Sequence, residues 1–114
     1  MQKKRNIVHA AINAVDGLKI LILQKAARRE LVLAVIAIIF FCYRPNVYTV
    51  LIAVLSLVLL AIEALNTAIE MLSDLFTLEE RPEIKKIKDL GAAAVFIILF
   101  AIGLIFIRYL SPFF

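Results

Sequence analysis

The sequence predicts an all-α membrane protein with one amphipathic surface helix and three transmembrane helices. The chain of 114 residues is 64% hydrophobic, with a mean hydropathy of +1.00, which is more apolar than a soluble domain of this size. Its apolar residues gather in long runs of the kind that cross a membrane. Its 13 Lys and Arg residues lie mostly on one side of those runs. We therefore expect a single membrane domain over residues 1–114.

Residues 1–29 form the predicted surface helix. Apolar residues recur at helical spacing through positions 7–22. The cations of this segment suit a helix on anionic headgroups, and they are Lys3, Lys4, Arg5, Lys19, Lys25, Arg28 and Arg29. A helix packed on the protein's own bundle explains the pattern equally well, and the two interpretations are compatible.

Membrane helices are predicted at about 30–44, 47–74 and 86–110. The first apolar run is short, so this helix must borrow length from the preceding turn, with its arginines snorkelling to the interface. Pro45 disfavours helical geometry at Arg44 and ends the helix. Residues 77–86 read as a polar loop. Small residues at 91–94 predict that the third span approaches the second closely.

The distribution of Lys and Arg predicts the orientation of the chain. Seven precede the first span, Arg44 alone follows it, four lie at 81–88, and Arg108 is near the end. The N-terminus and the 77–88 region should therefore be cytoplasmic and the C-terminus outside. This orientation explains the net charge of +4, and we do not expect a nucleic-acid partner.

A polar stripe marks the cytoplasmic end of the second span. Its members share one helical face, and they are Glu63, Asn66, Thr67, Glu70 and Asp74. Counting about 1.5 Å per residue from Asn46 places Glu63 roughly 25 Å along the helix, near the edge of a ~30 Å apolar core. Carboxylates near lipid are costly and usually functional. The stripe is therefore the predicted site.

The residue types of the stripe suit phosphoryl transfer. Glu70 and Asp74, one turn apart, suit Mg²⁺, which takes few protein carboxylates and keeps phosphate and water ligands. Glu63 lies deeper and suits a general base for a lipid hydroxyl. Lys88 supplies a cation for the transferring phosphate. The alternative, that these charges only mark where a helix leaves the membrane, stays open.

Two blocks, Glu63-Ala-Leu-Asn66-Thr-Ala-Ile-Glu70 and Lys88-Asp89-Leu-Gly-Ala-Ala-Ala-Val95, together resemble the prokaryotic diacylglycerol kinase family, which includes undecaprenol kinases. The resemblance spans nearly the whole chain. It implies a homotrimeric enzyme of the bacterial inner membrane that moves the γ-phosphate of Mg-ATP onto a lipid hydroxyl.

The resemblance also implies roles for single residues. Glu63 matches the catalytic base and would contact the lipid substrate together with Asn66 and Ala92. Glu70 matches a metal ligand. The implied ATP contacts are Glu70, Lys88, Asp89, Asn13 and Asn6.

The resemblance is incomplete before the first span. Family members usually carry a glutamate there as a second metal ligand, but the corresponding position is Lys25, or Gln24 after a shift by one residue. Either Glu30 or Asp74 takes over metal binding, or the activity is reduced or retargeted.

The leading interpretation is an ATP-dependent kinase for diacylglycerol, which yields phosphatidic acid, and undecaprenol is the alternative substrate. A small multidrug or ion exporter is a second class, but such proteins usually have four spans and a glutamate in the first. A third class is a catalytically weakened family member that acts as a binding or regulatory protein.

Overall fold

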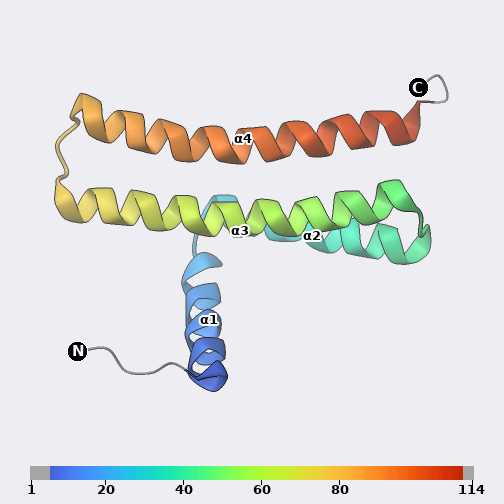
Figure 1. Cartoon of the computed structure of the whole chain (residues 1–114), viewed down its shortest axis with the longest axis horizontal. Coiled ribbons are helices and arrows are strands. Elements are labelled where there is room, and N and C mark those ends of the chain that lie inside the picture. The colour runs from blue at the N-terminus through green and yellow to red at the C-terminus, as the bar shows by residue number, and fades with distance from the viewer. Residues whose placement is uncertain (1–5, 112–114) are drawn as a thin grey trace.

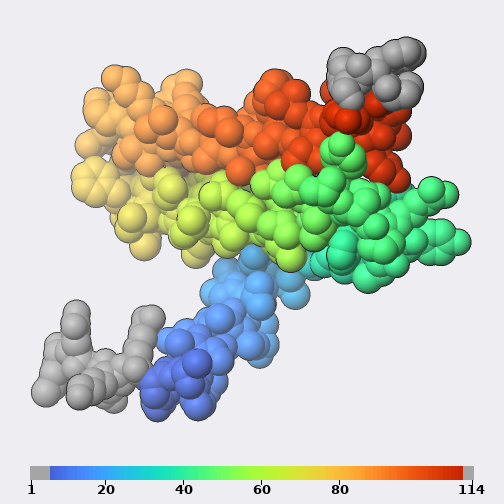
Figure 2. Space-filling model, turned by 45° about the vertical axis from the view of Figure 1, so that its right-hand side comes forward, coloured from blue at the N-terminus to red at the C-terminus, as the bar shows by residue number. Residues whose placement is uncertain are grey.

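In the computed structural model, which describes residues 6–111, the chain forms four α-helices (Figure 1). They are α1 (Ile7–Leu21), α2 (Lys25–Tyr43), α3 (Val47–Phe76) and α4 (Pro82–Leu110). Helices α2, α3 and α4 follow one another antiparallel, and α3 packs against both neighbours. Helix α1 runs crosswise to this bundle and projects from it (Figure 2). This arrangement suits a surface helix below a membrane bundle.

Within the described residues, α3 and α4 are long and apolar enough to cross a membrane. Helix α2 has 19 residues and carries Arg28, Arg29 and Glu30 in its first two turns. Because these charges shorten its apolar stretch, three spans remain a prediction. The all-α architecture is confirmed and is consistent with a membrane protein.

The polarity of the bundle is the reverse of that of a soluble protein. Its outer surface carries large apolar side chains, among them Phe96, Phe100 and Leu104 of α4, each more than half exposed. The buried face of α3 is mostly small or polar, and it comprises Thr49, Ala53, Ser56, Leu59, Glu63, Asn66 and Ser73. Small and polar residues between helices with apolar residues outside are typical of membrane bundles.

The turn between α2 and α3 lies at Pro45, as predicted. Asn46 caps α3, because its Oδ1 accepts the backbone N–H groups of Tyr48 and Thr49 at 2.9 and 3.0 Å. The Thr49 hydroxyl in turn accepts the Asn46 N–H at 3.0 Å. This reciprocal capping box satisfies donors that a helix start otherwise leaves unpaired.

The N-terminal segment differs from the single helix predicted over 1–29. Helix α1 ends at Leu21 and α2 begins at Lys25, five residues before the predicted start at 30. The chain turns because Gln24 is extended, with φ −83° and ψ 131°, while its N–H bonds to the Leu21 carbonyl at 2.9 Å. Residues 1–5, with three of the predicted surface cations, lie outside the described residues.

The loop between α3 and α4 is shorter than predicted. Helix α3 continues to Phe76, two residues past the predicted end, and α4 starts at Pro82 instead of 86. Proline in the first helical turn loses no hydrogen bond, since the N–H groups there have no intrahelical partner. The polar residues 82–86 therefore form the first turns of α4.

Candidate functional site

Acidic side chains meet where α2 packs on α3. Glu63 is 7% exposed, and its carboxylate is close enough to repel that of Glu30 on α2. Arg29 attracts both carboxylates. One oxygen of Glu30, Oε2, is buried without a hydrogen-bond partner among the described residues. Two carboxylates that repel each other where two helices pack are costly, which indicates a function.

Asn66 and Glu70 lie one turn further along α3. Asn66 Nδ2 donates to Glu70 Oε1 at 3.3 Å, while Glu70 itself is exposed. The Asn66 side chain is buried against α4, where the space beside Gly91 is filled by the Asn66 amide. Glu63 and Glu70 also repel each other. The predicted stripe is therefore one continuous polar face.

The cations at the start of α4 lie against acidic partners. Lys88 Nζ donates to Asp74 Oδ1 of α3 at 3.0 Å, and Lys85 Nζ donates to Asp89 Oδ2 at 2.6 Å. The first pair joins two helices and places the predicted phosphate-binding cation at the end of the stripe. It also occupies Asp74, one of the two candidates for the second metal ligand.

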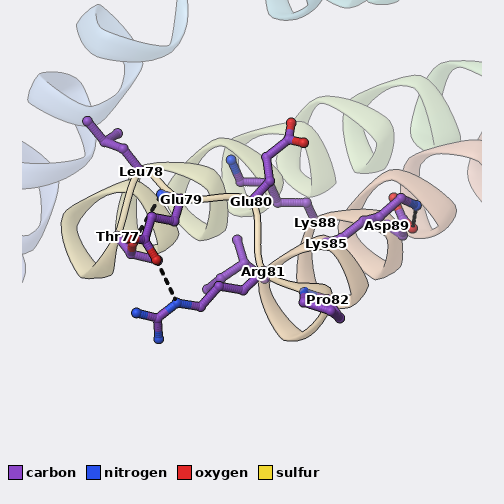
Figure 3. A pocket seen from close by; sticks show the side chains of 10 residues that line it. Thr77, Leu78, Glu79, Glu80, Arg81, Pro82, Lys85, Lys88 and Asp89 are labelled. Atoms are coloured by element: carbon purple, nitrogen blue, oxygen red, sulfur yellow. Dashed lines mark hydrogen bonds and ion pairs between the residues drawn. The ribbon is translucent and has the colours of Figure 1, made fainter.

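A pocket of about 540 Å³ opens where α3 passes into α4 (Figure 3). It is lined by Thr77–Pro82 together with Ile84, Lys85, Lys88 and Asp89. Both residues of the Lys88-Asp89 pair thus line one polar hollow next to the stripe. The hollow is lined by both cations and carboxylates, and its cations can attract a phosphorylated polar ligand.

Three of the residues that the resemblance implies lie apart from this cluster. Asn6 caps α1, since its Oδ1 accepts the His9 N–H at 2.9 Å. Asn13 is exposed on α1, and Ala92 is exposed on α4. Helix α1 faces α3 across a shallow apolar groove. The structure therefore places Glu63, Asn66, Glu70, Lys88 and Asp89 along the C-terminal half of α3 and the N-terminal turns of α4.

The donor set fits a magnesium ion that arrives with ATP. Among residues 6–111, no group of three or more His, Cys, Asp or Glu side chains could hold a metal ion alone. Magnesium usually takes only one or two protein carboxylates and completes its shell with phosphate oxygens and water. Exposed Glu70 can supply such a ligand, and Glu30 on α2, whose carboxylate is close enough to repel that of Glu63, has an oxygen without a partner among the described residues.

Two residues of the cluster were missed by sequence reasoning. Arg29 was expected only to snorkel, yet its charge also attracts the carboxylates of Glu30 and Glu63. Gly91 was expected only to bring helices together, yet it faces the Asn66 amide. Helical periodicity contains no signal for either contact, because each joins two different helices.

Comparison with known proteins identifies the family of the chain. The sequence profile of the prokaryotic diacylglycerol kinase family matches residues 12–110, which include all four helices except the first turns of α1. A comparison with curated protein sequences finds no match. The matched region contains the polar stripe of α3, the Lys88-Asp89 pair and the two apolar helices. The chain therefore belongs to the prokaryotic diacylglycerol kinase family.

Proposed function

We propose that the protein is an ATP-dependent lipid kinase that phosphorylates the hydroxyl of diacylglycerol and releases phosphatidic acid. The reaction takes place at the cytoplasmic surface of the bacterial inner membrane. Membership of a lipid kinase family supports the reaction class. The choice of diacylglycerol over undecaprenol rests on the Gly91–Val95 run, which looks more like the diacylglycerol branch.

The observation that carries the proposal is the buried carboxylate of Glu63. It is 7% exposed on a helix whose outer faces are apolar. A carboxylate at this depth can reach a hydroxyl of a lipid that stays in the bilayer. Its neighbours Glu30 and Arg29 come from α2, so the helix contact holds it in place. A structural role alone would not require an acid here.

The chemistry follows from this placement. Glu63 accepts the proton of the lipid hydroxyl as the oxygen attacks the γ-phosphorus of ATP. The new P–O bond forms while the bond between the γ-phosphorus and the β,γ-bridging oxygen breaks, and ADP leaves with that oxygen. Lys88 stabilises negative charge on the transferring group, which is the main requirement of phosphoryl transfer.

The nucleotide is assigned to the cytoplasmic end of α3 and α4. Glu70 and Glu30 hold the magnesium ion that accompanies ATP, and that ion neutralises phosphate charge when bound. Lys88 and Asp89 contact the nucleotide from the polar pocket. Lys88 must then leave Asp74, an exchange that an exposed ion pair of low net strength permits.

The wide apolar surface of the bundle and the exposed position of Glu70 support assembly into a homotrimer. In such an assembly a neighbouring copy covers part of the apolar surface and can complete the nucleotide site. With seven Lys and Arg residues before Glu30, where the apolar stretch of α2 begins, the N-terminus faces the cytoplasm and the C-terminus faces out.

The test is ATP turnover by purified protein in lipid vesicles containing diacylglycerol, undecaprenol or neither. We expect turnover with diacylglycerol, and we expect Glu63→Gln to lower it by about 10²- to 10⁴-fold, the usual contribution of a general base. Glu83→Gln is the matched control, because Glu83 is an exposed glutamate in the first turn of α4. It should leave turnover within about twofold.

The alternatives give different results. Turnover with undecaprenol alone would keep the kinase but replace its substrate. No turnover with either lipid, in protein that remains folded, would overturn the kinase proposal. It would favour the weakened, regulatory family member, for which the missing glutamate at Lys25 or Gln24 is the motivating observation.

A further inference from the structure

The contact between Gly91 and Asn66 has a feature that no other glycine of the chain shows. Gly91 is buried in α4, and a Cβ built on it would overlap Asn66 Oδ1 and lie 3.2 Å from Asn66 Cγ. Gly17 and Gly103 have no atom within 4 Å of the corresponding position. The Asn66 amide therefore occupies the volume that any side chain at position 91 would need.

The two ends of the Asn66 amide are held in different ways. The amide nitrogen donates to Glu70 Oε1 at 3.3 Å. The oxygen, Oδ1, is buried and has no hydrogen-bond partner among the described residues. Since the side chain is 8% exposed, water does not compete for the oxygen freely. Packing against Gly91, instead of a hydrogen bond, therefore fixes the position of Asn66 Oδ1.

We propose that Gly91 is a positioning residue for the phosphoryl-transfer site. The space left by its missing side chain holds the Asn66 amide in the orientation from which Nδ2 donates to Glu70. Glu70 is thereby directed toward the cytoplasmic side, where the magnesium ion and the phosphates would lie. The inference rests on the proposed function, because it gives Glu70 the task of holding that ion.

A methyl group at position 91 acts on Asn66 first. The overlapping atoms belong to a side-chain amide that can rotate, so the least costly response is a new Asn66 rotamer. The new rotamer breaks the bond to Glu70, which then loses its orientation. The helix itself should tolerate alanine well, since alanine has the higher helix propensity.

The chain offers a matched control for this substitution. Gly103 lies in the same helix, α4, and a Cβ there meets no atom within 4 Å. Gly91→Ala and Gly103→Ala therefore add the same methyl group to the same helix. Only the methyl group at position 91 meets the Asn66 amide.

The experiment uses the full chain in lipid nanodiscs, with three readouts for both variants. These are the Mg²⁺ concentration for half-maximal turnover, the rise in Tm on adding Mg²⁺ with a non-hydrolysable ATP analogue, and the ¹⁵N signal of the Asn66 side-chain amide. For Gly91→Ala we expect a tenfold or greater rise in the Mg²⁺ requirement, a smaller rise in Tm and a displaced amide signal. Gly103→Ala should match the unmodified protein in all three.

Asn66→Ala closes the test as a double-mutant cycle. It removes both the overlap and the bond to Glu70, and its missing signal identifies Asn66 among the four asparagines of the chain. In the Asn66→Ala background, Gly91→Ala should have little further effect. The affinity for the ATP analogue, derived from the rise in Tm, should change by less than twofold. If Gly91→Ala alone is unstable, adding Asn66→Ala should restore folding, because it removes the amide that the new methyl group would overlap.

Two outcomes would overturn the inference. One is an unmoved Asn66 amide signal with an unchanged Mg²⁺ requirement in Gly91→Ala. The other is that Gly91→Ala weakens binding of Mg²⁺ and the ATP analogue, measured by the rise in Tm, equally in the unmodified and the Asn66→Ala backgrounds. If the unmodified protein turns over neither lipid, the proposed function fails by itself. The Asn66 amide signal then still decides whether Gly91 orients Asn66, and the Tm response decides whether Glu70 uses that orientation.

Discussion

The two halves of α3 bury polar side chains in opposite ways. In the N-terminal half, the Thr49 hydroxyl donates to the Arg44 carbonyl at 2.7 Å, and the Ser56 hydroxyl donates to the Ile52 carbonyl at 2.8 Å. In the C-terminal half, Asn66 Oδ1 is buried without a hydrogen-bond partner among the described residues, as is Oε2 of Glu30 on the neighbouring helix. The buried hydroxyls of the N-terminal half are thus satisfied by nearby backbone carbonyls, whereas these two buried oxygens are not.

This difference separates structural from functional polarity. An unsatisfied buried polar group costs about 1–3 kcal/mol, so it is retained where a ligand or a reaction needs it. Thr49 and Ser56 let α3 pack closely on its neighbours at little cost, because each bonds to a nearby backbone carbonyl. Asn66 Oδ1 and Glu30 Oε2 have no such partner among the described residues, which we expect of groups that a ligand or the reaction uses.

The strongest test of this contrast uses the two candidates for the second metal ligand. Glu30→Gln should raise the Mg²⁺ concentration for half-maximal turnover by about tenfold, which corresponds to about 1.4 kcal/mol. Asp74→Asn should leave that concentration within about twofold, because we assign the second ligand to Glu30 and an exposed pair such as that of Asp74 with Lys88, at 3.0 Å, contributes only about 0–1 kcal/mol. Initial rates over a Mg²⁺ titration measure both. The reverse result would assign the metal to Asp74.

A smaller effect, on stability alone, is expected in the N-terminal half of α3. Asn46→Ala removes the oxygen that accepts the N–H groups of Tyr48 and Thr49, and loss of such a cap costs about 1 kcal/mol. We expect a lower Tm in detergent and unchanged turnover at a temperature where the variant is folded. A large loss of turnover without a fall in Tm would contradict the division of α3 into two halves.

The smallest effect is expected at Ser56. Its hydroxyl bonds back to the Ile52 carbonyl of the same helix, a contact that adds little to helix stability. Ser56→Ala should therefore change the free energy of unfolding by no more than about 0.5 kcal/mol and leave turnover unchanged. Denaturation in mixed micelles measures the first quantity. A loss of several kcal/mol would show that the hydroxyl serves a neighbouring helix.

Much of the architecture follows from the sequence. Apolar runs of membrane length predict the helices, and α3 and α4 have that length and character. Pro45 and Asn46 predict the turn before α3, because proline ends one helix and asparagine caps the next. Helical periodicity predicts the stripe from Glu63 to Asp74, since residues three and four apart share one helical face. These are relations within one helix, which the order of residues determines.

Relations between helices required the tertiary structure. That Glu30 faces Glu63, that Lys88 pairs with Asp74 and that Gly91 receives the Asn66 amide each depend on the axial shift and rotation of one helix against another. Those are decided by side-chain packing and by the turns that join the helices, such as the break between Leu21 and Lys25. The sequence by itself determined which polar residues share one face of α3, and only the packing of α2 and α4 decided which partners each of them meets.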